Sequence, residues 1–261
     1  MSVDAKRRRL RALLAERQEV EAVRYVDLCV VWELPSGETL LVAGGQWDRE
    51  ERRYTGKEAE FGIVYKLQPS QVEAATQLAW WMADRKANRP RDWVTLQLMG
   101  NRGAGKTALA AVAMVTLMVE FPTMGGKPSV GWMVSKAHTE QEELDREIAD
   151  NFPSRWYTYD SEDYQYRFLH GPKLTNVSAA HEGKTKRGRT DFLLLNEAQK
   201  VTKRSYLNAL ARISDKGGCS LITGNWTLEG RSGAWLYELE EKRKEAESAG
   251  KTWPIRLVNM D

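Results

Sequence analysis

Residues 100–107 of this chain read GNRGAGKT and match the pattern G-x-x-x-x-G-K-T, which strongly constrains the surrounding fold. The apolar run WVTLQLM at 93–99 precedes the pattern, and the apolar run KTALAAVAMVTLMVEF at 106–121 follows it. The first run has the length of a buried strand, and the second has the length of a helix that is apolar on nearly all sides. The pattern therefore predicts a strand, a tight glycine-rich turn and a buried helix in the middle of the chain.

The chemistry of this turn favours phosphate binding. Glycines let successive backbone N–H groups face a phosphate, and the N-terminus of the following helix adds partial positive charge. Lys106 would reach the β- and γ-phosphates of a nucleotide, and the Thr107 hydroxyl would bind Mg²⁺. The residues expected to bind the nucleotide are Gly100, Asn101, Arg102, Gly103, Ala104, Gly105, Lys106 and Thr107. The alternative is a glycine turn before a core helix, without a ligand.

Further patterns predict how the chain is arranged around this turn. The expected strands lie at 129–135, 192–195, 219–223 and 255–259, and the expected helices at 69–88, 139–151, 203–213 and 233–248. Thr139 and Glu142 form a capping-box pattern at the start of one helix, and the runs at 163–169 and 173–179 predict a hairpin. Strands that alternate with helices predict an α/β fold with a mostly parallel sheet and helices on both faces.

The N-terminal part of the chain has a different character. Residues 4–22 show the apolar spacing of a helix among many basic side chains, which are typical of a solvated face. Two strand-like runs around Pro35-Ser36-Gly37 predict a β-hairpin, and the polar residues 46–60 read as a linker or exposed arm. We expect an N-terminal helix and hairpin extension over residues 1–60 and a second domain over residues 61–261.

Composition narrows the class of protein. The 39 Lys and Arg residues nearly balance the 36 Asp and Glu residues, so net charge alone does not indicate nucleic-acid binding. Cys29 and Cys219 lie in apolar runs without metal-ligand spacing, which predicts buried thiols in a reducing compartment. The longest apolar helix, about 15 residues, is too short to span a bilayer. We therefore expect a soluble intracellular protein with no membrane partner.

A second candidate segment is FLLLNEA at 192–198. A Mg²⁺-dependent nucleotide hydrolase needs a carboxylate near the metal and often a second one that orients the attacking water. Glu197 suits the second role, whereas Asn196 stands where an Asp is expected; its amide oxygen could accept a bond from Mg²⁺-bound water. Asp191 cannot replace it, because it lies ~16 Å away at ~3.3 Å per residue. The alternative is a core strand that ends in a polar loop.

The order of four segments resembles the ATPase domain of a tailed-phage large terminase, over about residues 67–261. LQPSQ, with Gln71, resembles its adenine-contacting motif, and GNRGAGKT, with Arg102, resembles its phosphate loop. RGRTDFLLLNEAQ resembles the segment leading into its acidic strand, which normally ends in Asp-Glu. LITGN, ending at Thr223–Asn225, resembles its coupling motif.

The resemblance implies a P-loop NTPase of the ASCE type that uses ATP and Mg²⁺ to move double-stranded DNA. It implies that Lys106 and Arg102 stabilise γ-phosphate charge, that Thr107 and Asn196 serve the metal, and that Glu197 orients water. Residues Thr223 and Asn225 would sense the γ-phosphate. The implied partners are duplex DNA, a homo-oligomeric ring on a phage portal or procapsid and a small terminase subunit. The implied location is the cytoplasm of an infected host bacterium, without secretion.

Several alternatives stay open. Gln71 could start a helix without reading adenine. Arg187 and Arg189 could belong to a solvated loop, act as an arginine finger on a neighbouring subunit, or contact DNA phosphates. Because of Asn196, the chain could be a nucleotide-binding switch or assembly module with weak or no hydrolysis; another P-loop motor, such as a helicase, is a third reading. The chain ends at RLVNMD, where terminases usually continue into a nuclease domain, so we expect no nuclease activity.

Overall fold

The computed structural model describes most of the chain from residue 30 onward. The described residues are 30–33, 39–43, 46–48, 53–55, 63–88, 94–101, 103–169, 171–180, 188–213, 217–226, 233–251 and 253–260. The predicted helix at 4–22 lies outside them, as do Cys29, Arg102 and Arg187.

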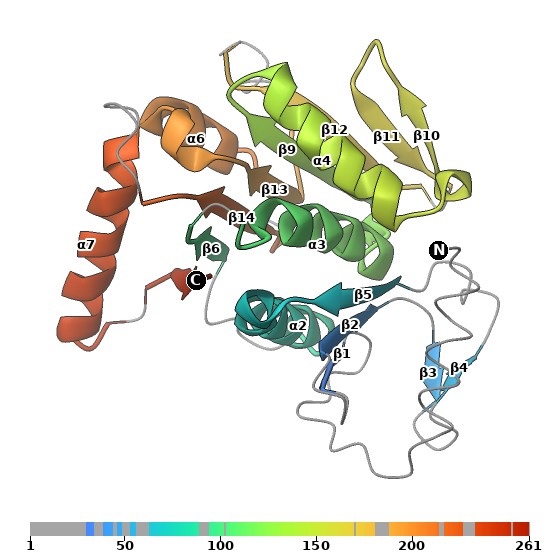
Figure 1. Cartoon of the computed structure of the whole chain (residues 1–261), viewed down its shortest axis with the longest axis horizontal. Helices are drawn as coiled ribbons and strands as arrows, with labels where there is room; N and C mark the ends of the chain where they lie inside the picture. The colour runs from blue at the N-terminus through green and yellow to red at the C-terminus, as the bar shows by residue number, and fades with distance from the viewer. Residues whose placement is uncertain are drawn as a thin grey trace.

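An eight-stranded sheet forms the centre of the structure (Figure 1). In spatial order its strands are β10 (Tyr157–Asp160), β11 (Gln165–Phe168), β12 (Lys173–Ser178), β9 (Val130–Ser135), β13 (Phe192–Leu195), β14 (Cys219–Gly224), β6 (Thr95–Met99) and β15 (Ile255–Asn259). All pairings from β12 to β15 are parallel, and only β10, β11 and β12 pair in antiparallel fashion. The mostly parallel sheet and the hairpin before 179 are confirmed. β14 lies between β6 and β13.

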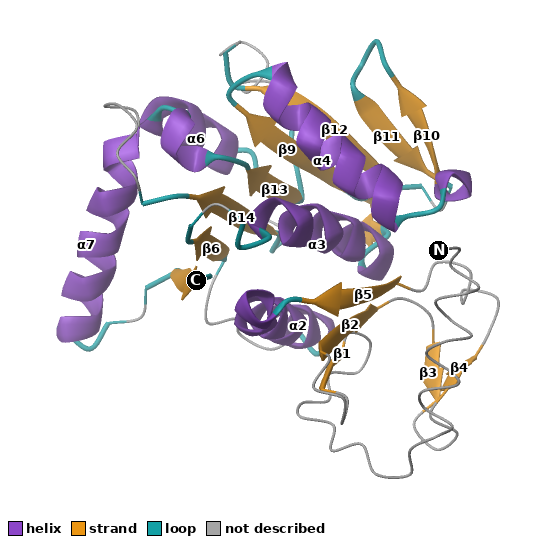
Figure 2. Cartoon of the chain, viewed as in Figure 1, coloured by secondary structure: helices purple, strands orange, loops and turns teal. Residues whose placement is uncertain are grey.

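Helices cover both faces of this sheet, as expected (Figure 2). The alternation along β13 shows why: Phe192 and Leu194 pack with the first group of helices, whereas Leu193 and Leu195 pack with the second. The first group comprises α2 (Val72–Lys86), α3 (Lys106–Glu120) and α4 (His138–Asn151), and the second comprises α6 (Lys203–Leu210) and α7 (Ala234–Ser248). Short 3₁₀ turns occur at η2 (Pro69–Gln71), η3 (Ser154–Trp156) and η4 (Ala198–Lys200).

Local patterns predicted the burial of one helix correctly and the start of another wrongly. α3 is buried along nearly its whole length, as its uniformly apolar sequence predicted. The capping box predicted at Thr139 and Glu142 is wrong, because α4 begins at His138 and its cap is Ala137. The Glu140 carboxylate accepts a hydrogen bond from the Ala137 backbone N–H at 3.2 Å, so the acidic half of the cap lies two residues earlier than predicted.

The N-terminal hairpin is present but belongs to a larger sheet. β1 (Val30–Glu33) pairs with β2 (Thr39–Ala43) as predicted, and β2 also pairs with β5 (Ile63–Leu67). β5 lies beyond the expected boundary at residue 60, and that division stays a prediction. Residues 46–60, read as a linker or an exposed arm, contain the pair of strands β3 (Gln46–Asp48) and β4 (Arg53–Thr55), which the sequence did not predict.

Two remaining features complete the fold. A small hairpin of β7 (Thr123–Met124) and β8 (Lys127–Pro128) follows α3. Within the ranges that the structure describes, no helix is both long enough and apolar enough to cross a bilayer.

Candidate nucleotide-binding site

The predicted motifs meet at one edge of the central sheet. Met99, at the end of β6, is paired with Gly224 of β14 and with Asn259 of β15. Leu195, at the end of β13, is paired with Ile222 of β14. Because these strands are parallel, the segments that follow β6, β13 and β14 all emerge at the same carboxyl edge. This is the edge at which open α/β sheets bind their ligands.

The glycine-rich turn encloses the Lys106 side chain. Gly105, which precedes α3, adopts a left-handed conformation with φ 71° and ψ 21°. A side chain there would also collide with Gln71, because a Cβ would lie 2.5 Å from Gln71 Nε2. The Lys106 ammonium is buried and donates to the carbonyl oxygens of Gly100 at 3.0 Å and Asn101 at 2.5 Å. The turn thus holds a cation at the N-terminus of a helix, where an anion would be favoured.

The turn η2 donates side-chain hydrogen bonds to the backbone of the phosphate loop. The fully buried Gln71 amide donates through Nε2 to the Gly105 carbonyl at 2.8 Å and accepts through Oε1 from the Gln68 N–H at 2.8 Å. The Ser70 hydroxyl donates to the Ala104 carbonyl at 3.2 Å. Gln71 therefore supports the loop backbone, a role that the motif alone did not suggest. Its contact with adenine stays a prediction.

On the neighbouring strands, one hydroxyl joins the acidic segment to the expected coupling segment. Thr223 Oγ1 donates to Asn196 Oδ1 at 2.8 Å and accepts from the Glu197 N–H at 3.2 Å. Both Asn196 and Thr223 are fully buried. This hydroxyl joins the end of β14 directly to the residues that follow β13.

The Glu197 carboxylate is fixed by its own loop. Glu197 adopts a left-handed backbone with φ 51° and ψ 52°, and Oε2 accepts from Gln199 Nε2 at 2.7 Å. Lys200 Nζ lies 3.5 Å from the same oxygen and 3.2 Å from Glu140 Oε1 of α4. Although partial burial lowers the pKa of Lys200, the contacts with Glu140 and Glu197 raise it above its ordinary value. Lys200 therefore stays charged and holds Glu197 toward α4.

The structure does not bring every predicted residue to this edge. Arg189 is exposed and precedes the amino end of β13, on the opposite edge of the sheet from Lys106. It therefore cannot be the arginine finger of its own subunit, and its action on a neighbour stays a prediction. Asp191 also lies at that far edge, where Oδ2 accepts from the Val130 N–H at 2.9 Å. Its exclusion as a substitute for Asn196 is confirmed.

Comparisons with known proteins identify the fold. No known protein family and no curated protein sequence matches this chain. The solved structure of the bacteriophage HK97 large terminase matches with 14% identity and a TM-score of 0.53, over 75% of this chain and 39% of that chain. The large terminase of a thermophilic bacteriophage matches with 18% identity and a TM-score of 0.52, over 74% of this chain and 44% of that chain.

The chain has the α/β P-loop fold of the phage large terminases. It spans less than half the length of the two large terminases that it matches, and at these identities the likeness concerns the fold. The terminase fold places the phosphate loop, Glu197 and Thr223 at one edge of the sheet.

The donor and acceptor atoms at this edge of the terminase fold suit a nucleotide. Among the described residues, the buried atoms Asn196 Nδ2 and Asn225 Oδ1 have no hydrogen-bond partner. Such atoms are costly unless a ligand satisfies them. Asn196 Nδ2 is a donor, which suits a phosphate oxygen, and the side-chain oxygen Asn225 Oδ1 is an acceptor, which suits metal-bound water. Nowhere in the described ranges do three His, Cys, Asp or Glu side chains form a metal cluster.

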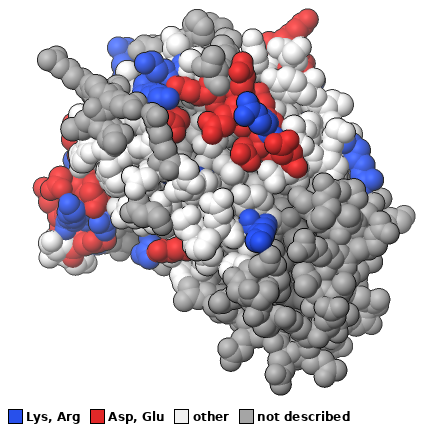
Figure 3. All heavy atoms as spheres, in the orientation of Figure 1, with Lys and Arg blue, Asp and Glu red and all other residues white. Residues whose placement is uncertain are grey.

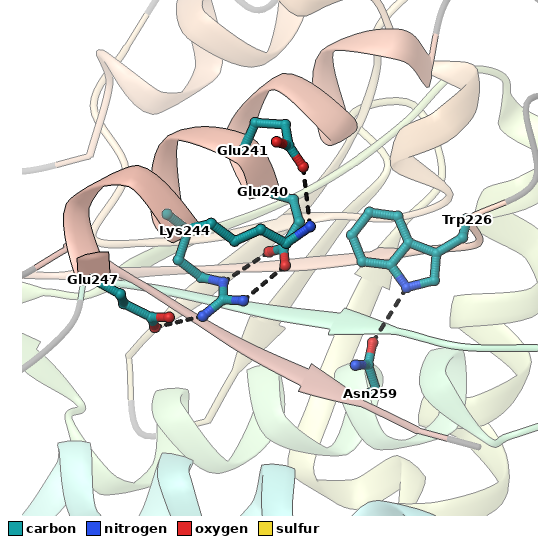
Figure 4. A network of polar contacts seen from close by, with 7 residues as sticks. Trp226, Glu240, Glu241, Lys244, Glu247 and Asn259 are labelled. Carbon is teal, nitrogen blue, oxygen red and sulfur yellow. Dashed lines mark hydrogen bonds and ion pairs between the residues drawn. The ribbon is translucent and has the colours of Figure 1, made fainter. Parts of the chain in front are cut away.

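Beyond this edge, a polar network in the terminase fold ties the coupling segment to β15 (Figure 4). Trp226 Nε1 donates to Asn259 Oδ1 at 3.2 Å, which joins the segment after β14 to the end of β15. Several charged side chains of α7 pair along their own helix, with Arg243 bound to Glu240 and Glu247, and Lys244 bound to Glu241. These α7 charges are neutralised by neighbouring side chains, so they add no net charge to the candidate nucleotide site.

Proposed function

We propose that this chain is the ATPase motor domain of a viral genome-packaging terminase, in which ATP hydrolysis drives translocation of double-stranded DNA. The observation that best supports this proposal is the hydrogen-bonded link through Thr223. It connects the Glu197 loop to the strand beside the phosphate loop, so a single edge can bind nucleotide, act on it and respond to it.

Each residue at the edge has a role in this proposal. Lys106 and Arg102 neutralise charge on the transferred phosphate, and the Thr107 hydroxyl holds Mg²⁺, which when bound neutralises charge on the phosphate oxygens. Glu197 accepts a proton from the attacking water and orients it. Thr223 and Asn225 respond to the γ-phosphate and carry its loss along β14.

The wider assembly follows from the same proposal. The matched proteins are phage large terminases, and we infer that this chain works with duplex DNA and a homo-oligomeric ring on a portal or procapsid. A small terminase subunit would accompany it in the cytoplasm of an infected bacterium. The outer face of α4 is unsuited to DNA, because exposed acidic residues Glu142, Glu143 and Asp150 gather there (Figure 3). Their repulsion of phosphates directs DNA to another face.

One observation favours a second function, a nucleotide-binding switch with little or no turnover. Asn196 brings no negative charge to the metal, and its carbonyl oxygen already accepts the Thr223 hydroxyl. A metal shell without that carboxylate would be weaker. In this alternative the Thr223 link reports nucleotide binding without hydrolysis.

Steady-state phosphate release from the purified chain distinguishes these functions. We expect ATP hydrolysis that increases when duplex DNA is added and increases less with single-stranded DNA of equal nucleotide concentration. ATP binding without phosphate release would support the switch. Stimulation by single-stranded DNA alone would support a helicase-type motor and contradict the terminase proposal.

A further inference from the structure

Gln199 lies at the centre of the candidate site, although no motif assigned it a role. It is almost fully buried in η4, two residues after Glu197. Its amide makes two hydrogen bonds of opposite polarity: Nε2 donates to Glu197 Oε2 at 2.7 Å, and Oε1 accepts from the Asn225 N–H at 3.2 Å. One rigid amide thus links the carboxylate after β13 to the backbone after β14.

The surroundings hold this amide in one place. A Cβ on Gly224 would lie 3.1 Å from Gln199 Oε1, and a Cβ on Gly233 would lie 3.1 Å from Gln199 Cα. Two backbones without side chains therefore pack closely around Gln199, one from the end of β14 and one from the start of α7. Just beyond, Trp235 Nε1 of α7 donates to the Val201 carbonyl at 2.9 Å. The Gln199 side chain consequently has little room to turn.

The backbone at Glu197 makes this support necessary. A non-glycine residue in the left-handed region is sparsely populated and persists where surrounding contacts fix it. The Glu197 N–H is held by Thr223 and its carboxylate by Gln199 and Lys200. Lys200 is a flexible point charge at 3.5 Å, whereas the Gln199 amide is a directional donor at 2.7 Å. Gln199 therefore sets the direction of the carboxylate.

We infer that Gln199 is the positioning residue of this site: it couples the direction of the Glu197 carboxylate to the position of the Asn225 backbone. The inference rests on the proposed ATPase function. When the segment after β14 moves, the amide moves with it and carries Glu197 toward or away from the position in which it orients water. Gln199 itself contacts neither nucleotide nor water in this role.

Two substitutions of Gln199 change the two hydrogen bonds of its amide in different ways. Gln199→Met keeps the length and volume of the side chain but removes both hydrogen bonds. Gln199→Glu keeps an acceptor for the Asn225 N–H and replaces the amide donor to Glu197 with a second carboxyl group. If direction of the carboxylate is what matters, both variants lower single-turnover ATP hydrolysis by roughly tenfold or more, because small misplacements of catalytic groups are costly. ATP affinity should stay within about twofold, since no phosphate contact is lost.

A matched control and a double variant exclude a merely structural role. Gln165→Met removes a comparable amide bond, to Thr175 at 3.0 Å on β12, and should hydrolyse ATP as the wild type does. In a Glu197→Gln background, Gln199→Met should cause no further loss of turnover, because Gln199 acts through Glu197. The double variant Glu197→Gln with Gln199→Glu again pairs a donor with an acceptor, now in the opposite direction. It should therefore be thermally more stable than Gln199→Glu alone, whereas its turnover should stay low.

The outcomes separate this inference from the proposed function. Wild-type turnover in Gln199→Met, an ATP affinity that falls in proportion to turnover, or independent effects of the two positions would overturn the positioning role and leave the ATPase proposal standing. Absence of hydrolysis in the wild type would overturn the proposed function and the positioning role together.

Discussion

Asn196 and Thr223 face each other across β13 and β14, and the polarity of their hydrogen bond decides what each can offer a ligand. Because the Asn196 oxygen accepts the Thr223 hydroxyl, the amide nitrogen is the atom left for a nucleotide. An Asp at this position could accept the same hydroxyl and present a second, negatively charged oxygen. An Asp at 196 would therefore add a negative charge beside the proposed Mg²⁺ site and leave the link to Thr223 intact.

We predict that Asn196→Asp lowers the Mg²⁺ concentration needed for half-maximal ATP hydrolysis and raises turnover. Opposite charges ~4 Å apart attract by ~4 kcal/mol at an effective dielectric near 20. Burial of the carboxylate removes much of this attraction. A remaining gain of about 1 kcal/mol changes Mg²⁺ affinity several-fold. The measurement is an Mg²⁺ titration of hydrolysis at saturating ATP.

The control for that titration is Asn88→Asp, since Asn88 is exposed at the end of α2 and has φ 52°, which Asp tolerates. Its curve should match the wild type. Identical curves for Asn196→Asp and wild type would contradict a role for position 196 at the metal. A lower rate for the Asp form would mean that the site is adapted to the amide.

Gln71 provides a second prediction at the residue scale. Gln71→Leu removes the donor to Gly105 and should lower affinity for ATP and for GTP by the same factor. That factor is about fivefold for the loss of ~1 kcal/mol from one neutral hydrogen bond. The measurement is equilibrium binding of both nucleotides. A loss of ATP affinity alone would show instead that Gln71 reads the adenine.

At the scale of elements, local sequence patterns predicted most of the central sheet and little of what joins it to its surroundings. β6 and α3 were predictable because an apolar run and a fixed glycine spacing are local signals. β5 and its pairing with β2 were not, because that pairing joins distant segments. The cap at Ala137 was missed because alanine has no capping side chain.

The candidate site shows the same contrast between features with a local sequence signal and features that depend on distant segments. Lys106 and Glu197 were located from short patterns next to strands, and Thr223 was located from the resemblance of LITGN to the terminase coupling motif. The roles of Ser70, Gln71 and Gln199 depend on which backbone groups they meet, and no local pattern encodes that. The sequence shows only a Gln two positions after the expected catalytic acid, and its burial is known from the structure.

A prediction at this scale concerns the ion pair between Lys86 of α2 and Glu120 of α3, which braces the two helices behind the phosphate loop. The Glu120 side chain is 3% exposed and that of Lys86 is 24% exposed. Lys86→Met leaves the carboxylate buried without this cation and should destabilise the fold by about 2 kcal/mol, after allowance for partial exposure. Denaturant unfolding measures the change.

Two further variants test the cause of that loss. Adding Glu120→Leu to Lys86→Met should recover part of the stability, because no buried charge remains. Lys244→Met, which removes an exposed pair with Glu241, should unfold close to the wild type. Equal stabilities of the single and double variants would contradict the assignment of Lys86 and Glu120 as a coupled pair.

At the scale of the whole molecule, charge is distributed unevenly over the described surface. The outer surface of α4 is acidic and under the proposed function would repel DNA, whereas the Lys106 ammonium lies at the carboxyl edge of the sheet. Arg189 lies at the opposite edge of the sheet from Lys106. The proposed nucleotide site and the proposed contact of Arg189 with a neighbouring subunit or DNA therefore lie at separate edges.

The most direct test of the account is the rate of ATP hydrolysis by three proteins: wild type, Lys106→Ala and Glu197→Gln. ATP affinity and the unfolding midpoint are measured on each protein as controls. Lys106→Ala should keep the fold and lose ATP binding or hydrolysis, because it removes the cation of the phosphate loop. Glu197→Gln should keep ATP affinity and lose turnover, because an amide cannot accept the proton of the attacking water. Wild-type turnover in either variant would contradict the assignment of this edge as an ATP-hydrolysing site.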